Sequence, residues 1–562
     1  VCALTLSPAL CGVILREHAK GKKHNILKRS FDRAFDAVSG SYAWLVRLLV
    51  RPSVIAIPTL AFVATGLLIA WSVASVPTGF VPDEDKGLLV AEIRMPASAS
   101  QQRTLEVLQR VEKIFLETDG VNSTGAFQGF SLIAGNGSNY GVAFAGLKPW
   151  SYRVPKHRDL QTMLSEVRAK FSSIQEGVVI AFYLPAVEGV GNAAGFDLRL
   201  QDRGGVGRDR LEQIVQEVVA DANAQSKLRN VASPFRAGVP QIFADVDREK
   251  AKKLGVSLQD LFGTLSVNLG SAYVNDFNKF GRTWQVTAQA ESQFRSRADQ
   301  IAHLEVRNSS GSMIPLGSLL SVSESTGPES VIRYNLFPAA TINGASAPGV
   351  STGEALAVVE DMLAKMKPQG VGYEWTSLSF QEKQAAGTAG LVFALALLVV
   401  YLILAGLYES WTVPLVVVLS IPLAVLGAML GLMYRGMDNN IYTQVGLVLL
   451  VGLGAKNAIL IVEFAKANRE KGASIADAVI EAARLRLRPI LMTALAFILG
   501  VLPLVHATGA GAASRQAIGT AVFFGMIGNT FLGLVFTPVL YVVIQSATER
   551  LFGAPKPKSP AA

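Results

Sequence analysis

One lysine stands deep inside a long apolar stretch of the sequence. Residues 441–464, IYTQVGLVLLVGLGAKNAILIVEF, are long enough to cross a bilayer, because roughly 20 residues at about 1.5 Å per residue span the hydrocarbon core. Lys456 lies about 15 residues into this stretch. An ammonium group at that depth costs roughly 3 kcal/mol unless it is paired or reaches water. We therefore expect Lys456 to face a polar pathway inside a helix bundle; the alternative is that it extends to the membrane surface.

The groups near Lys456 in the sequence leave it without a buried acid. Glu463 follows on the same helical face but roughly 10 Å along the axis, too far for a direct ion pair. Thr493 belongs to the next predicted span, and Arg486 stands just before that span, where it could instead anchor lipid headgroups. No aspartate lies inside any complete predicted span, so we infer that the acidic partner lies upstream of Val1. Such a pair suits proton coupling, because the pKa of the acid shifts as the lysine approaches or recedes.

A second candidate site is apolar. Residues 125–141, GAFQGFSLIAGNGSNYG, predict a flexible glycine-rich loop that carries Phe127, Phe130 and Leu132. Such a loop suits an adaptable apolar binding site, or it buries its own aromatic rings. The segment lacks the Lys-Ser/Thr ending of a phosphate-binding loop.

Neighbouring predicted strands carry further apolar residues. Strand alternation places Ile180, Phe182 and Leu184 on one face of a sheet, and Phe144 lies on another strand. From these residues alone, a place in the hydrophobic core is favoured over a ligand-binding wall.

Composition identifies the class of protein. Half of the 562 residues are hydrophobic, and several apolar runs of roughly 20 residues predict a polytopic α-helical membrane protein. The net charge of +9 comes mostly from two segments that flank apolar runs, which indicates membrane topology and not nucleic-acid binding. The five histidines lack metal-ligand spacing, the large polar region has no cysteines for a disulfide framework, and no nucleophile–base pair suggests an enzyme.

The charge distribution orients the predicted spans. The spans are residues 53–76, 385–408, 412–434, 441–465, 489–505 and 517–544. Basic residues concentrate in 16–51 and in a predicted loop at 466–488, which should both be cytoplasmic. Within the first of these, residues 26–50 predict an amphipathic helix in the membrane interface. The chain opens with valine inside an apolar stretch, so we expect it to be part of a longer protein.

The polar region between the first two of these spans alternates predicted strands and helices. Residues 77–193 contain the βαβ pattern twice, which is the split-βαβ or ferredoxin-like unit. A second unit begins at residue 196, is interrupted by an insertion at about 239–325, and resumes at residue 339. The expected fold class is therefore a polytopic helical membrane protein with a large α+β region built from ferredoxin-like βαβ repeats.

Eight motifs together resemble one family. They are LSPALC (6–11), GFVPDEDKG (79–87), AYVNDF (272–277), PGVSTGEA (348–355), LYESW (407–411), GLGAKNAILIVEFAK (452–466), RLRLRPILMT (484–493) and AFILGVLPL (496–504). The chain resembles the C-terminal half of a resistance–nodulation–division (RND) multidrug efflux pump of the hydrophobe/amphiphile class.

The resemblance implies a homotrimeric drug:proton antiporter in the bacterial inner membrane, surrounded by membrane lipid. It implies a periplasmic adaptor protein and an outer-membrane channel as partners, drug-like amphiphiles and protons as transported species, and neither cofactor nor nucleic acid. The domains it implies are the end of a transmembrane helix (1–15), a cytoplasmic amphipathic segment (16–52), a transmembrane helix (53–76), a periplasmic pore subdomain (77–193), a second pore subdomain (194–238 with 326–384), a docking insertion (239–325), five transmembrane helices (385–545) and a cytoplasmic tail (546–562).

The resemblance also assigns residues. Lys456, Arg486 and Thr493 match the family's proton relay, whose two aspartates lie in the N-terminal half. The family's switch loop matches residues 125–141. Its pocket positions fall on Leu88, Val90, Phe127, Phe130, Leu132, Phe144, Ile180, Phe182 and Leu184. Leu132 and Ile180 are aliphatic where well-known members carry phenylalanine, and the loop is one residue longer, which bears on drug preference.

Two other functions are compatible with the residues. One is a membrane protein that scaffolds or binds partners without transport, in which case Lys456 would be dispensable. The other is an RND relative that exports a different class of substrate; the acidic and methionine relays of metal exporters are missing from the spans.

Overall fold

A computed structural model of the chain describes residues 5–14, 26–191, 194–366 and 368–553. Its internal contacts divide the chain into two units. The helical unit comprises Val1–Val81, Ala386–Ala507 and Ala512–Ala562. The sheet-rich unit comprises Pro82–Ala385 and Thr508–Gly511.

Six helices within the described residues are long and apolar enough to cross a membrane. They are α3 (Ala56–Ser75), α12 (Ala389–Tyr408), α13 (Val413–Arg435), α14 (Ile441–Glu470), α15 (Ile475–Val505) and α16 (Ala512–Phe552). Each of the six predicted spans coincides with one of these helices. The prediction of a loop at residues 466–488 is wrong, because α14 and α15 continue through it and leave only residues 471–474 between them. Arginine, lysine and alanine are good helix formers, so this polar segment extends both helices.

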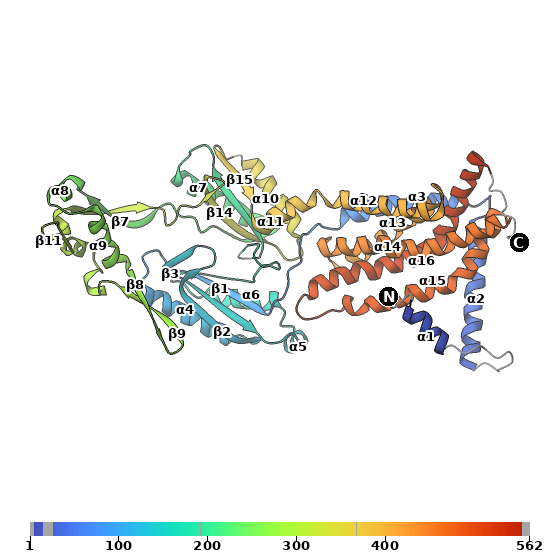
Figure 1. Ribbon diagram of the computed structural model, residues 1–562, viewed down its shortest axis with the longest axis horizontal. Coiled ribbons are helices and arrows are strands. Elements are labelled where there is room, and N and C mark those ends of the chain that lie inside the picture. Colours follow the sequence, from blue (N-terminus) through green and yellow to red (C-terminus); the bar gives the residue numbers. More distant parts are fainter. Residues whose placement is uncertain (1–4, 15–25, 192–193, 367, 554–562) are drawn as a thin grey trace. The chain divides into compact units, whose positions relative to one another are not determined.

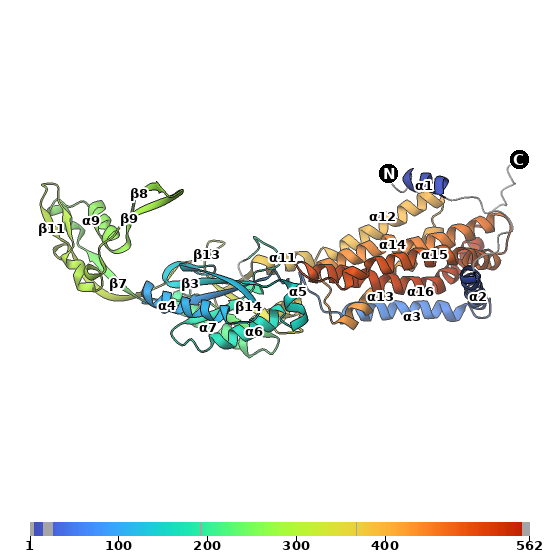
Figure 2. The ribbon, with the colours of Figure 1, turned by 90° about the horizontal axis from the view of Figure 1, so that it is seen from below.

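Glycines let two of these helices approach closely. Gly427 on α13 lies against Gly528 on α16, where a Cβ added to Gly427 would stand 3.0 Å from the Gly528 Cα. Small residues at helix contacts allow such close packing within a membrane. Another helix of this unit, α2 (Ile26–Leu49), runs across the direction of the spanning helices (Figures 1 and 2). On α2, the Tyr42 hydroxyl donates a hydrogen bond to the Leu534 carbonyl of α16 at 2.8 Å. The short α1 (Ser7–Ile14) precedes it.

The first sheet of the other unit has the strand order β2-β3-β1-β4, with all neighbours antiparallel. Its strands are β1 (Leu88–Arg94), β2 (Val121–Ser131), β3 (Gly135–Leu147) and β4 (Val178–Phe182). Helices α4 (Gln101–Leu116) and α6 (Leu160–Phe171) cover one face, where Leu89, Ala91 and Ile93 of β1 pack with Phe115 and Phe171. Ser100 and Asp159 cap these helices through backbone N–H groups, which explains where the helices begin. The short α5 (Trp150–Arg153) precedes α6.

The second sheet has the order β13-β14-β5-β15, and β6 also pairs with β14. Its strands are β5 (Phe196–Asp202), β6 (Leu228–Ala232), β13 (Arg333–Tyr334), β14 (Phe337–Ser346) and β15 (Val371–Trp375), with α7 (Arg208–Ala224) and α10 (Thr352–Met366) packed on them. The chain leaves this sheet after β6 and returns before β13. Helix α11 (Ser377–Ala386) follows β15.

The segment inserted between β6 and β13 has a hydrophobic core of its own. It contains β7 (Val239–Val246) paired with β12 (Leu320–Gly327), α8 (Arg248–Lys253), α9 (Leu258–Leu265), β10 (Glu305–Arg307), β11 (Met313–Pro315) and an exposed hairpin of β8 (Ala272–Lys279) and β9 (Arg282–Ala288). Leu261 and Leu316 are fully buried in that core.

The predicted flexible loop at residues 125–141 is instead a β-hairpin. β2 and β3 extend through it, with Phe130 opposite Asn136 and Ser131 opposite Gly135, and only residues 132–134 turn. Gly129, with φ 82°, accommodates the irregularity between Gln128 and Phe130. The glycine content weakens local strand preference, but pairing along the whole of β3 overrides it. β4 ends at Phe182, so Leu184, which was predicted to share a strand face with Ile180 and Phe182, lies beyond the strand.

Candidate functional site

The face of the first sheet that the helices leave uncovered gathers many of the predicted pocket residues. The register places Val90 of β1 opposite Phe144 of β3 and Phe182 of β4. Val90, Val142 and Phe182 are buried here, and Leu132, Ile133, Phe144 and Leu184 pack against them. This apolar cluster thus unites five residues predicted from the resemblance, namely Val90, Leu132, Phe144, Phe182 and Leu184. It adds Val142 and Ile133, which were not among the predicted pocket residues.

The other four predicted residues lie outside this cluster. The ring of Phe127 meets that of Phe144 edge-on, with 5.9 Å between centroids, and the side chain is 59% exposed. Phe130 is also exposed, and Leu88 is half-buried at the start of β1. Ile180 pairs in register with Glu92 of β1 and faces a cavity.

That cavity has a volume of about 360 Å³ and lies between the two sheets. One wall is formed by Val178, Ile180 and Phe182 of β4 together with the β2–β3 turn. The opposite wall comes from β6 and β14, including Val231 and Asn343. Its size and its largely apolar wall suit a drug-sized ligand.

One buried carboxyl lines the cavity and was missed by the sequence analysis. Glu92 is only 7% exposed. The Ser131 hydroxyl donates a hydrogen bond to Glu92 Oε1, while Oε2 has no partner among the described residues. Burial raises the pKa of Glu92, and the hydrogen bond from Ser131 offsets only part of that rise. The signal was present in β1, LLVAEIR, because Glu92 shares the alternation of Val90 and so had to face the same side.

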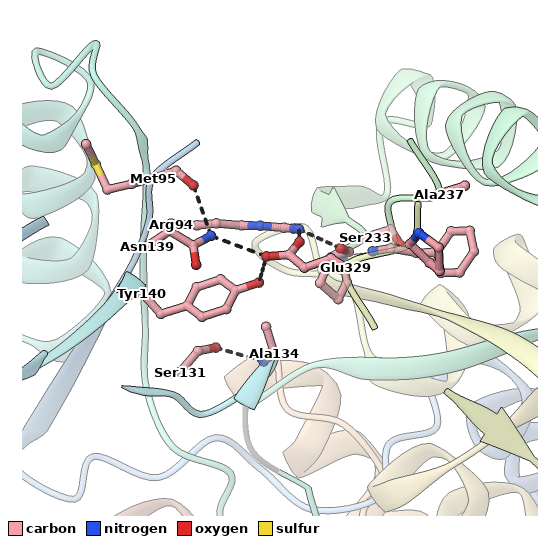
Figure 3. Close-up of polar contacts among 12 residues, drawn as sticks. Arg94, Met95, Ser131, Ala134, Asn139, Tyr140, Ser233, Ala237 and Glu329 are labelled. Atoms are coloured by element: carbon pink, nitrogen blue, oxygen red, sulfur yellow. Dashed lines mark hydrogen bonds and ion pairs between the residues drawn. The ribbon is translucent and has the colours of Figure 1, made fainter. Parts of the chain in front are cut away.

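A polar cluster joins the first sheet to the segment that precedes β13 (Figure 3). Glu329 accepts hydrogen bonds from Arg94 of β1 at 2.7 Å, from Asn139 at 3.2 Å and from the Tyr140 hydroxyl. Arg94 also donates to the carbonyl of Pro234, just after β6, at 2.8 Å. Burial opposes ionisation of Glu329, but these donors together outweigh it and lower its pKa. Burial, reinforced by the hydrogen bond to Glu329, raises the pKa of Tyr140 to about 12.

The predicted relay residues lie on α14 and α15. Lys456 is exposed in this chain, on a stripe of α14 that also carries Gly452 and Glu463. Arg486 of α15 is half-buried; its guanidinium lies over the Phe464 ring at 3.5 Å from the centroid, and its Nε has no hydrogen-bond partner among the described residues.

Thr493 is also half-buried, and its hydroxyl donates to the Ile490 carbonyl of its own helix at 3.2 Å. Within the described part of the chain, no hydrogen bond or ion pair joins Lys456, Arg486 and Thr493. The three side chains therefore occupy neighbouring helices without forming a closed network.

The chain belongs to the AcrB/AcrD/AcrF family, whose sequence pattern matches residues 1–545. This is a family of RND efflux transporters, not of enzymes, and its members sit in the inner membrane. The six apolar helices agree with that location.

Three relatives show how far the similarity extends. The multidrug/solvent efflux pump membrane transporter MepB of Pseudomonas putida is 42% identical over 562 residues, which is 99% of this chain and 53% of MepB. The multidrug resistance protein MdtF of Escherichia coli K12 is 41% identical over 553 residues, 98% of this chain and 53% of MdtF. The multidrug export protein AcrF of the same strain is 38% identical over 553 residues, 97% of this chain and 53% of AcrF. The chain thus spans about half the length of these relatives.

Proposed function

We propose that this chain is part of an inner-membrane transporter that exports drugs and other amphiphiles in exchange for protons. The observation that carries the proposal is the family match along nearly the whole chain. The cavity between the two sheets supports it independently, because it offers an amphiphile a drug-sized space with both apolar and charged side chains in its walls.

We propose that the nine predicted pocket residues form the substrate-binding region. The apolar cluster gives it a packed floor, and Ile180 and Phe182 extend into the cavity wall. Phe127 and Phe130 are exposed on the β2–β3 hairpin, where they are available to a ligand that enters from outside. Leu88 contributes at the end of the same sheet face.

The proton relay is proposed from Lys456, Arg486 and Thr493. A lysine and a glutamate on the exposed stripe of α14 are costly against lipid, so this stripe should be covered by protein. We propose that the part of the relatives which this chain does not match covers the stripe and supplies the carboxylate for Lys456. Protonation of that acid would release Lys456 and let the helices repack, which is the basis of alternating access.

The domain organisation and assembly follow the same proposal. Both sheets have a strand order compatible with the ferredoxin-like unit, so residues 77–193 and residues 194–238 with 326–384 would be the two pore subdomains. Residues 239–325 would be the docking insertion, and α2 the amphipathic helix at the cytoplasmic interface. The transporter would act as a homotrimer with a periplasmic adaptor and an outer-membrane channel.

Lys456→Met in the full-length transporter tests the coupling. We expect proton-driven efflux of a fluorescent drug from proteoliposomes to fall to the level of empty vesicles, because the methionine keeps the packing volume but removes the charge. The matched control is Lys471→Met, an exposed lysine directly after α14, which should transport normally. Normal efflux by a folded Lys456→Met protein would refute the relay, whereas a folded wild-type protein that exported no drug would favour a scaffold that does not transport.

A further inference from the structure

Three arginines line the cavity, and only one of them is neutralised. Arg94 is paired with Glu329 at 2.7 Å. Arg168 of α6 and Arg236, after β6, also line the cavity. Among the described residues, no carboxylate lies within 4.0 Å of the Arg168 or Arg236 guanidinium. The Arg168 Nε donates to the Ala181 carbonyl at 2.9 Å, which orients the group while its two Nη atoms stay available for a ligand.

A fourth arginine reinforces the positive charge at this place. Burial lowers the pKa of the Arg168 guanidinium. The nearby positive charge of Arg229 on β6 lowers it further. The Arg229 Nε is buried without a hydrogen-bond partner, and its Nη2 meets the Gln161 amide oxygen at 3.4 Å. Gln161 in turn donates to the Tyr183 hydroxyl at 3.4 Å, and that hydroxyl donates to Asp83. No ion pair of Arg229 with a carboxylate is found in the described part of the chain.

Glu92 is the only acid among the lining residues, so the charge balance can be stated simply. With Arg94 paired to Glu329, two guanidinium groups, Arg168 and Arg236, face one carboxyl. The balance stays positive when Glu92 is ionised and becomes more positive when it is protonated. A protonated Glu92 would moreover offer a hydrogen-bond donor at Oε2, the oxygen that lacks a partner.

We infer that this cavity selects amphiphiles with an anionic head group, such as a carboxylate or sulfonate, held by Arg168 and Arg236 with the apolar body against Ile180, Phe182 and Val231. The inference rests on the proposed function. Guanidinium groups match oxyanions with paired N–H donors, and partial burial strengthens that attraction at Arg168, while Arg236 adds its charge from the exposed side of the cavity. A cationic head group would meet like charge from both arginines.

Two probes with one apolar body test the head-group preference. Anilinonaphthalene sulfonate carries a sulfonate, and N-phenylnaphthylamine is its uncharged counterpart. Fluorescence titration of the purified full-length transporter should show that Arg168→Ala/Arg236→Ala weakens sulfonate binding about tenfold and leaves the neutral probe within about twofold, because charge-assisted hydrogen bonds are lost. Arg168→Lys/Arg236→Lys should retain part of the preference.

Single variants keep the test decisive if the double variant folds poorly. Arg236 is exposed and forms no side-chain hydrogen bond or ion pair in the described part of the chain, so Arg236→Ala and Arg236→Glu should fold normally. Arg236→Glu should weaken sulfonate binding further than Arg236→Ala. The matched control is Arg210→Ala, which removes an exposed arginine of α7 outside the cavity.

The outcomes separate the two proposals. If the wild-type transporter exports neither probe from energised proteoliposomes, the proposed function fails. If it exports both, and the Arg168 and Arg236 variants lower binding of both probes equally or of neither, the head-group inference fails alone.

Discussion

The most consequential single residue beyond the predicted sites is Glu92. Its carboxyl is buried at the edge of the cavity with one oxygen unpartnered, which is an expensive arrangement unless the group titrates or a ligand completes it. It shares a sheet face with Val90, so the same strand supplies an apolar and an acidic surface to one site.

Glu92→Gln should stabilise the transporter at neutral pH. Burial raises the folded-state pKa of Glu92, so the stability that the carboxyl contributes is fully present below its unfolded pKa, about 4.3, and is lost as the pH rises through the folded value. Glutamine keeps an oxygen for the Ser131 hydroxyl but cannot ionise. The variant should therefore melt a few degrees higher at pH 7, with the difference shrinking towards pH 4.

Thermal unfolding across this pH range provides the measurement, with the exposed Glu106→Gln of α4 as the control. A Glu92→Gln protein that melts no higher than wild type at pH 7 would show that the ionised carboxylate is satisfied in the folded protein.

At the scale of single residues, the sequence predicts correctly which side chains of one strand share a face of the sheet. Alternation predicts that residues of one parity share a face, and Phe182 does lie with Val90 and Phe144. Alternation also extends to Glu92, but a search for apolar pocket residues passes over an acid. The partners Glu329 and Pro234 of Arg94 lie 235 and 140 residues away, and no local pattern reveals such contacts.

At the scale of elements, long apolar helices and alternating strands were predictable, and their ends were not. The segment 466–488 is rich in charge, yet helix propensity carries α14 and α15 through it until Gly472 and the Ser474 cap interrupt them. The glycine-rich segment 125–141 forms a hairpin because β3 supplies a partner for its whole length. Both outcomes depend on neighbours that the local sequence does not specify.

Helices α13 and α16 approach each other closely at Gly427. A Cβ on Gly427 would stand 2.4 Å from the Phe524 carbonyl oxygen, a backbone atom that cannot rotate away. Gly427→Ala should therefore force the helices apart and cost about 1–3 kcal/mol. Gly454→Ala is the matched control on α14, because its added Cβ meets its nearest neighbours at 3.6 Å.

Melting of the purified full-length transporter in detergent distinguishes these variants. We expect Gly427→Ala to melt several degrees below wild type and Gly454→Ala at or slightly above it, since alanine favours helix by about 1 kcal/mol over glycine. Equal melting temperatures of the two variants would mean that the helices can accommodate a methyl group at Gly427 without separating.

Within the sheet-rich unit, the cluster around Glu329 joins the two sheets. Arg94, Asn139 and Tyr140 belong to the first sheet or its edge, whereas Glu329 and Pro234 belong to the segments that lead into and out of the second. The cluster therefore links the two sides of the cavity, and we expect it to limit how far they can separate. In an alternating-access transporter such a contact would have to break and reform in each cycle.

Glu329→Gln should loosen this contact. The glutamine amide can still accept the hydrogen bonds from Asn139 and Tyr140 at its oxygen. It removes the negative charge that the Arg94 guanidinium contacts at 2.7 Å. We expect a cysteine placed at Ala232, in the cavity wall, to react several-fold faster with a thiol reagent when Glu329 is also changed, in a background of Cys2→Ser and Cys11→Ser. Glu217→Gln, which alters an exposed ion pair on α7, should leave the rate unchanged.

The same contact should weaken in acid, opposite in sign to the effect of Glu92. The hydrogen bonds from Tyr140, Arg94 and Asn139 outweigh burial and lower the folded-state pKa of Glu329, so its contribution is present above the ordinary glutamate pKa of about 4.3 and is lost as the pH falls through the folded value. Labelling of the Ala232→Cys site should therefore accelerate below about pH 4 in the wild-type background, relative to an exposed cysteine, and should change little in Glu329→Gln. If both backgrounds accelerated equally, the walls would be held by packing and the ion pair would not control access to the cavity.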